Sequence, residues 1–248
     1  FVERINISGN TTTLDRVIRR QFKIVEGDAL NPREIRASAE RIRALGFFST
    51  SDVSTQEGSA SNQRVVDVSV SEKPTGSLSF GANYNSANGI GLLASFREAN
   101  FRGRGQATNA SINTTASTKN LSFSFEEPAV LGRDVSLRLG LKYGRTSGNN
   151  ARYDTENSDT FSALGFPLSN VETLELKVFS EAELLSNVTT NSNIIKNEAL
   201  AGRRSNFGLG YGYSFDNRRT GLNPKAGTFL KFSQDFALDR SNSFVRTN

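Results

Sequence analysis

Helical and strand-like patterns of apolar residues follow one another in the first seventy residues. Residues 1–8 alternate between apolar and polar side chains, which predicts a short strand. Apolar residues then recur at helical spacing over 14–22 and again over 31–45, which predicts two helices. Phe47-Phe48 and Val53 indicate a further strand, and residues 66–70 alternate again, with a polar hairpin loop between the two strands. This order allows both helices to cover one face of a three-stranded sheet.

Capping residues stand at the start of both predicted helices. Thr12 precedes Asp15 by three residues, which is the spacing of a capping box. Asn31 can cap the second helix, Pro32 suits its first position, and Glu34 can reach back to the cap. We therefore expect the side chain of a capping residue to bond the backbone at each of these N-termini.

Helical spacing disappears after Lys73-Pro74, and alternating segments continue to the end of the chain. About ten such segments follow, and we expect most of the strands that they mark to be long enough for the ~9–11 residues that a tilted membrane strand needs. Small, polar or charged side chains occupy one face of almost every segment, which suits the water-filled inside of a barrel. The segments are 78–84, 90–96, 110–114, 121–125, 135–143, 174–178, 207–215 and 230–238, with an out-of-phase one at 161–168 and a short last one from Phe244.

The connections between these segments alternate in length. Long polar connections are expected at Thr146–Thr160 and Ser186–Arg204, and compact ones at Arg102–Gly105, Pro128–Asp134 and Ser169–Glu172. Short turns at one end and long loops at the other are typical of bacterial outer-membrane barrels. A soluble β-sandwich would also alternate, but the polar face and the loop pattern favour a membrane barrel.

Motifs in both halves of the chain resemble the BamA family of outer-membrane protein assembly factors. Gly9-Asn10, Arg19-Arg20, Glu26-Gly27 and RIRALGFFSTSDV at 41–53 resemble the polypeptide-transport-associated (POTRA) domain that adjoins the family's barrel. EKPTGSLSFGANYN at 72–85 resembles the junction with the first barrel strand. FDNRRTGLNPKAGTFLKFSQDFA at 215–237, with Pro224 and Gly227, resembles a turn and strand of that barrel.

The resemblance implies an α+β POTRA domain of order β-α-α-β-β at 1–73 and the N-terminal part of an antiparallel transmembrane β-barrel at 74–248. The family barrel has about sixteen strands, and this chain would supply about ten of them. We therefore expect a piece of a longer protein that lies in the bacterial outer membrane, with its POTRA domain in the periplasm.

The function that the resemblance implies is the assembly and insertion of β-barrel proteins into the outer membrane. In this family the first barrel strand pairs weakly with the last, so the seam can open and pair with a client strand by β-augmentation. The seam residues would be Gly76, Ser77, Leu78, Ser79, Phe80, Gly81, Ala82, Asn83 and Tyr84. Gly and Ser weaken such a strand, although small residues could also simply line a crowded lumen. A POTRA-barrel secretion pore or a TamA-type factor is the alternative.

An accessory lipoprotein is a second partner that the resemblance implies. Glu26 matches an acidic position that the family uses towards the lipoprotein BamD, and Arg19, Arg20 and Arg36 are candidate neighbours. Exposed charges of this kind are otherwise solvated surface. Outer-membrane lipid, unfolded β-barrel clients and periplasmic chaperones complete the expected partners.

Composition excludes several kinds of chemistry. The chain has no His and no Cys, so imidazole or thiolate metal sites and Ser-His or Cys-His nucleophile pairs are excluded. The net charge of +5 comes without a basic stripe, so nucleic acid is not expected. Glu126-Glu127 and the alternating Glu181 and Glu183 are more typical of solvated acids than of catalysis, and GRG at 103–105 lacks the helix of a phosphate loop. We expect no cofactor and no enzymatic activity.

Overall fold

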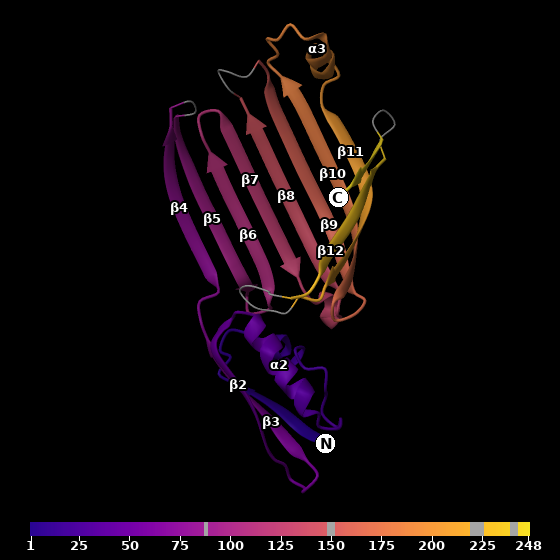
Figure 1. Cartoon of the computed structure of the whole chain (residues 1–248). Helices are drawn as coiled ribbons and strands as arrows, with labels where there is room; N and C mark the ends of the chain where they lie inside the picture. The colour runs from indigo at the N-terminus through magenta and orange to yellow at the C-terminus, as the bar shows by residue number, and fades with distance from the viewer. Residues whose placement is uncertain (87–88, 148–151, 219–225, 239–242) are drawn as a thin grey trace. The chain divides into compact units, whose positions relative to one another are not determined.

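A computed structural model describes residues 1–86, 89–147, 152–218, 226–238 and 243–248 (Figure 1). The chain forms two compact units. The first contains Phe1–Ser77 and Glu98–Ala107, and the second contains Leu78–Arg97 and Thr108–Asn248. No helix within the described ranges combines the length and the apolarity needed to cross a bilayer.

The first unit is a three-stranded sheet with two helices. Its elements are β1 (Val2–Ser8), α1 (Asp15–Arg19), α2 (Pro32–Ala44), β2 (Phe48–Glu57) and β3 (Arg64–Glu72). Strand β3 lies in the middle, parallel to β1 and antiparallel to β2. The predicted order of strands and helices is confirmed.

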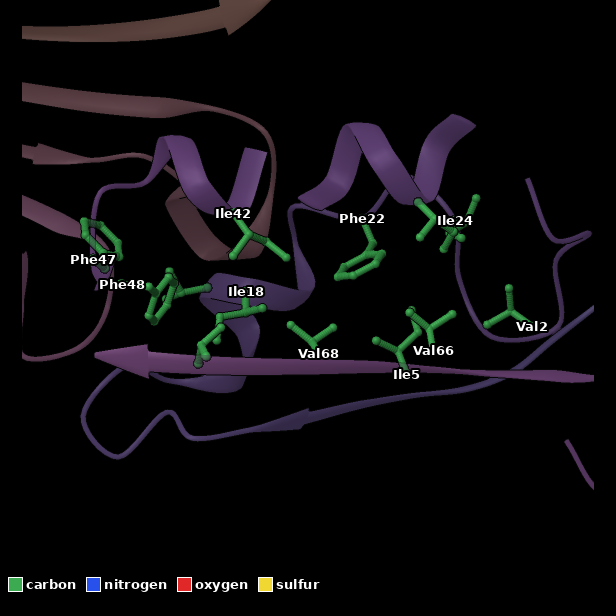
Figure 2. Packing of buried hydrophobic residues seen from close by; sticks show 13 residues of the cluster. Val2, Ile5, Ile18, Phe22, Ile24, Ile42, Phe47, Phe48, Val66 and Val68 are labelled. Carbon is green, nitrogen blue, oxygen red and sulfur yellow. The ribbon is translucent and has the colours of Figure 1, made fainter. Parts of the chain in front are cut away.

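Apolar side chains from the helices and the sheet meet in one core, which Figure 2 shows. Val66 and Val68 of β3 point towards the helices, and Ile42 of α2 is fully buried against them. Gly46 follows Leu45, the C-cap of α2, and adopts a φ of 73°, a conformation that glycine tolerates without a steric penalty. The chain can therefore turn sharply and bury the rings of Phe47 and Phe48, whose centres lie 6.2 Å apart.

The predicted cap is confirmed for one helix and wrong for the other. The side chain of Asn31 accepts a hydrogen bond from the backbone of Arg33 at the start of α2. By contrast, Leu14 occupies the N-cap of α1, and no side chain caps that helix. The threonine loop before α1 instead donates its backbone N–H groups to the carboxylate of Glu72.

The second unit is built on a ten-stranded sheet whose strand order follows the sequence. The strands are β4 (Gly76–Asn85), β5 (Gly89–Phe101), β6 (Gln106–Thr114), β7 (Thr118–Glu127), β8 (Ser136–Thr146), β9 (Asp154–Pro167), β10 (Glu172–Ser186), β11 (Arg204–Asp216), β12 (Phe229–Ala237) and β13 (Phe244–Thr247). Pairing is antiparallel from β7 to β13. Strands β4 and β13 form the two ends, so the sheet is not closed in this chain (Figure 1).

The out-of-phase segment, up to Pro167, belongs to β9 and is regular in structure. Phe161 lies opposite Gly140 of β8 and Phe179 of β10. A Cβ on Gly140 would come within 2.1 Å of the Phe161 ring, so this aromatic side chain occupies space that the glycine leaves on the polar face. Leu164 and Phe166 then lie on the opposite, apolar face.

The long connections differ from the expectation. Strand β8 reaches Thr146 and β9 begins at Asp154, so the first loop is shorter than predicted. The loop between β10 and β11 contains a helix that the sequence pattern did not predict, α3 (Asn193–Leu200). The turn after β7 includes the short 3-10 helix Val130–Gly132. Pro224, which forms part of the quoted family motif, lies outside the described residues.

Candidate functional site

The predicted seam residues form a single strand at one end of the large sheet. Strand β4 is hydrogen-bonded to β5, and no second strand pairs with it in the described part of the chain. Leu78, Phe80 and Tyr84 are 63%, 77% and 76% exposed. A Cβ on Gly81 would meet only Leu93, at 3.8 Å, so crowding among the described residues does not account for this glycine. The role of β4 as a seam stays a prediction.

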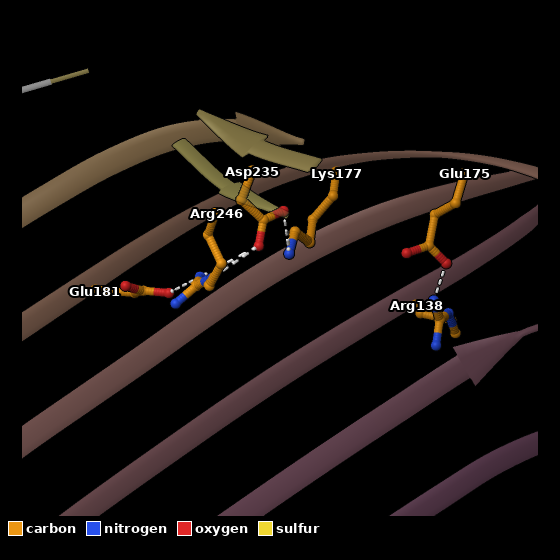
Figure 3. A network of polar contacts seen from close by, with 6 residues as sticks. All are labelled: Arg138, Glu175, Lys177, Glu181, Asp235 and Arg246. Carbon is orange, nitrogen blue, oxygen red and sulfur yellow. Dashed lines mark hydrogen bonds and ion pairs between the residues drawn. The ribbon is translucent and has the colours of Figure 1, made fainter. Parts of the chain in front are cut away.

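The far end of the sheet is tied together by charged side chains on its polar face, and Figure 3 shows this network. Nζ of Lys177 on β10 lies 2.6 Å from the carboxylate of Asp235 on β12, which is only 4% exposed. Arg246 of β13 contacts Asp235 at 3.2 Å and Glu181 of β10 at 2.5 Å. We call Lys177, Glu181, Asp235 and Arg246 the charged cluster. Glu181 is therefore ion-paired, whereas the sequence predicted a solvated acid.

Glycines and an aromatic ring make room for the charged cluster. Gly210 of β11 stands between Lys177 and Asp235 in the strand register. A Cβ on Gly210 would lie 2.3 Å from the Asp235 carboxylate. Lys177 and Asp235 can therefore approach each other only because position 210 has no side chain. The ring of Phe179 lies 5.1 Å from the Lys177 ammonium, a distance that permits a cation–π contact. On the same face, Arg138 of β8 forms an ion pair with Glu175 of β10 (Figure 3).

Two predicted contact residues of the first unit, Arg19 and Glu26, bind each other and close the edge of β1. The Glu26 carboxylate accepts from the backbone N–H of Ile5 at 3.1 Å, and Arg19 donates to the Ile5 carbonyl at 3.1 Å. The two charged groups are 3.0 Å apart and nearly half exposed. The backbone N–H of Val2 donates to the Asp28 carbonyl, and the Val2 carbonyl accepts from the backbone N–H of Gly27. An unpaired strand edge invites pairing, and these contacts occupy the edge of β1.

The same contacts set the charge of Glu26. The hydrogen bond from the Ile5 backbone, followed by that from Arg19, lowers the pKa of Glu26 below its usual value. Arg36 is exposed on α2, and no hydrogen bond or ion pair joins it to Glu26 among the described residues. Arg20 lies near Gly105, where an added Cβ would come within 2.6 Å of its guanidinium. The structure therefore brings together two of the four predicted contact residues.

Glu72 organises the loop before α1, a structural role that the sequence analysis missed. It accepts hydrogen bonds from the Thr11 hydroxyl at 2.7 Å and from the backbone N–H groups of Thr12 and Thr13 at 2.9 and 2.6 Å. Burial alone raises the pKa of Glu72, but the hydrogen bonds from these three threonines outweigh it and hold that pKa at about 2. Three consecutive threonines facing an acid 60 residues away leave no local signal in the sequence.

The GRG motif is a turn, as predicted, and belongs to the first compact unit. Gly103 and Gly105 have φ angles of 70° and 69°. The Gly103 carbonyl accepts from the Leu14 backbone at 2.8 Å, and a Cβ on Gly103 would come within 1.9 Å of the Thr12 carbonyl. The buried side chain of Asn100 donates to the Thr13 hydroxyl at 2.8 Å. This turn therefore packs against the loop that Glu72 holds.

Two protein-family models match the chain. The Omp85 superfamily domain matches residues 100–248. The POTRA model, described as a surface antigen variable number repeat, matches residues 1–73.

Curated relatives carry the name outer membrane protein assembly factor BamA. The protein from Neorickettsia risticii is 32% identical over 143 residues, which are 57% of this chain and 19% of the relative. The protein from Nitratidesulfovibrio vulgaris is 30% identical over 164 residues, which are 65% of this chain and 19% of the relative. The chain thus spans about a fifth of the length of these relatives.

Solved structures resemble the whole chain. BamA from Haemophilus ducreyi lacking POTRA domains 1-3 matches with a TM-score of 0.73 at 23% identity, over 98% of this chain and 49% of that one. CdiB from Escherichia coli matches with a TM-score of 0.60 at 14% identity, over 98% and 46%. These likenesses confirm the predicted fold class, a POTRA domain followed by an incomplete antiparallel barrel.

Proposed function

Because the chain belongs to the Omp85 superfamily, we propose that the complete protein assembles and inserts β-barrel proteins into the bacterial outer membrane. The BamA relatives are named for this activity. The observation that carries the proposal is the position of β4, which follows the POTRA domain and forms the first strand and one end of the large antiparallel sheet. A strand in that position can offer its backbone to another chain.

Main-chain pairing suits a protein that must accept many clients. The N–H and C=O groups of a strand edge are the same in every sequence, so recognition depends little on client side chains. Gly76 and Gly81 weaken the packing of β4, which lowers the cost of exchanging one partner strand for another. Client strands would pair along Gly76–Tyr84, with no covalent chemistry by any side chain and no cofactor.

The two faces of the sheet support the proposed placement in the membrane. Leu176 and Leu209 are about half exposed on the apolar face, whereas the charged cluster occupies the other face. A barrel in a bilayer turns its apolar face to lipid and its polar face to the lumen. We therefore place the sheet in the outer membrane and the POTRA domain in the periplasm, where unfolded clients and their chaperones arrive.

The accessory-lipoprotein contact remains part of the proposal. Arg19 and Glu26 are nearly half exposed even while they hold β1, so a partner can reach both charges. Arg36 is exposed on α2 and Arg20 is partly so, and both would extend the same charged surface. A BamD-like lipoprotein with a complementary charge pattern is the expected partner.

A POTRA-barrel pore for protein secretion is the second candidate function, and the fold that the chain shares with CdiB is compatible with it. Loss of an assembly factor and loss of a secretion pore should affect different proteins. A pore serves its own secreted partner, whereas an assembly factor serves many unrelated barrels.

Depletion of the complete protein in its own bacterium tests the proposal. We expect the folded amounts of several unrelated outer-membrane barrels to fall together, and re-expression to restore them. Loss of a single secreted protein with unchanged barrels would instead establish the secretion pore and overturn the assembly function.

A further inference from the structure

A groove crosses the apolar face of the second unit at the level of β9. It is an open groove of about 370 Å³, a volume similar to the ~300–1,000 Å³ of small-molecule sites. Its walls include Leu139 and Leu141 of β8 and Val178 of β10, and its floor includes Thr160, Ser162 and Ser180. All six side chains lie on the face opposite the charged cluster, which the strand register fixes.

The strand register explains why the groove exists. Ser162 stands between Leu139 of β8 and Val178 of β10, and Thr160 stands opposite Leu141. Neighbouring strands lie ~4.8 Å apart, so small side chains on β9 leave a furrow between rows of large ones. Leu164, two residues further along the same face, ends the furrow on one side. The small residues of β9, together with Ser180 of β10, therefore form the floor of the groove.

The chemistry of the groove selects an apolar occupant. Its surface is almost entirely carbon, with only three small hydroxyl groups. An ordered water needs two to four polar partners, which such a surface does not supply, and an empty furrow forfeits the dispersion contacts of its lining. The groove is continuous with the face that the proposed function turns to lipid. We propose that it binds one acyl chain of a membrane lipid in a defined position.

The width of the groove favours an acyl chain over a protein. The floor of the groove is one to two strands wide, with Thr160 and Ser162 on β9 and Ser180 on β10. At ~4.8 Å per strand this floor is narrower than a helix and can hold an extended hydrocarbon chain. A helix with its side chains is ~10–12 Å across and would rest on the walls rather than reach the hydroxyl floor. A second copy of the sheet would present its own wide apolar face and leave the furrow unfilled in the same way.

Photo-crosslinking in vesicles tests the proposal, which rests on the membrane placement above. The complete protein is reconstituted in phosphatidylethanolamine–phosphatidylglycerol vesicles that contain a lipid with a diazirine in its acyl chain, and labelled residues are mapped by mass spectrometry. We expect labelling to concentrate on Leu139, Leu141 and Val178. Ser162→Leu fills the furrow and should reduce this labelling severalfold. Ser158→Leu makes the same change on the same face of β9, opposite Tyr143 and Ala182, and should leave it unchanged.

The outcomes separate failure of the groove from failure of the proposed function. Even labelling of the groove, Leu176 and Leu209, unaffected by Ser162→Leu, would overturn the acyl-chain site but keep the sheet in the membrane. Absence of label from all of these residues would overturn the membrane placement itself. A crosslinked protein or second copy at the groove that Ser162→Leu removes would replace the lipid by a protein partner.

Discussion

Several charged side chains of the first unit form hydrogen bonds with backbone groups of the same unit. Glu26 and Arg19 hold both polar groups of Ile5, and Glu72 holds the threonine loop. Buried or edge backbone groups left without partners are costly. A substitution at these positions therefore changes local structure as well as surface charge.

Substitutions of Glu26 can separate these two effects. Glu26→Lys removes the acceptor of the Ile5 amide and places a second cation beside Arg19, so we expect amide exchange at Ile5 to accelerate about tenfold or more. Glu26→Gln keeps an acceptor and should change it much less. Hydrogen exchange of the complete protein, with lipoprotein binding measured in parallel, checks this. Arg36→Glu changes charge on the same proposed contact surface without touching the Ile5 amide, so exchange at Ile5 should stay unchanged in it. Lost lipoprotein binding in Glu26→Gln with an unchanged Ile5 amide would assign Glu26 to direct contact.

The low pKa of Glu72 predicts a pH dependence of the threonine loop. A carboxylate whose pKa is lowered from its usual ~4.3 to about 2 stabilises the folded loop above pH ~4.3, and this contribution is lost as the pH falls towards 2. The carboxylate is partly exposed, so we expect only ~1 kcal/mol. Exchange of the Thr12 and Thr13 amides, corrected for intrinsic rates, should be faster in Glu72→Gln than in wild type near pH 6, and the difference should shrink between pH 4 and 2. A pH-independent difference would contradict this.

At the scale of elements, alternation and capping predicted most of the strands and the long helix of the first unit. The sequence could not predict Phe161 on the polar face, because its place depends on Gly140 in the neighbouring strand. The sequence could not predict the charged cluster either, because its members also lie on different strands. Arg246 and Glu181 are 65 residues apart in the sequence, and only the register of the intervening strands brings them together.

Two glycines of β11 provide a matched test of the charged cluster. A methyl group on Gly210 would force Asp235 away from Lys177, so Gly210→Ala should lower the free energy of unfolding by ~1–3 kcal/mol. A Cβ on Gly212 meets nothing closer than 3.6 Å, so Gly212→Ala should be neutral or slightly stabilising. Urea unfolding of the complete protein in lipid vesicles checks both. Equal effects of the two substitutions would show that the cluster contributes no measurable stability.

At the scale of the whole chain, the two ends of the large sheet differ in how firmly they are held. The cluster of Lys177, Glu181, Asp235 and Arg246 joins β10, β12 and β13 across the polar face. The described ion pairs include none on β4, and Gly81 contributes no side chain to the packing of that strand. Local opening occurs where such contacts are few, so the leading strand is the end from which the sheet should open.

The proposed seam can be tightened without creating a clash. Glycine within a strand is ~0.5–1 kcal/mol less favourable than alanine, and a Cβ on Gly81 has room beside Leu93. Gly81→Ala should therefore stabilise β4 in its paired state and reduce its opening about two- to fivefold. Insertion of a client barrel into vesicles should slow by a similar factor, while amide exchange in β10 stays unchanged and that in β4 slows. Gly212→Ala, a mild substitution in a strand away from the seam, should leave insertion unaffected. Unchanged insertion in Gly81→Ala despite slower exchange of β4 would show that opening of this strand does not limit assembly.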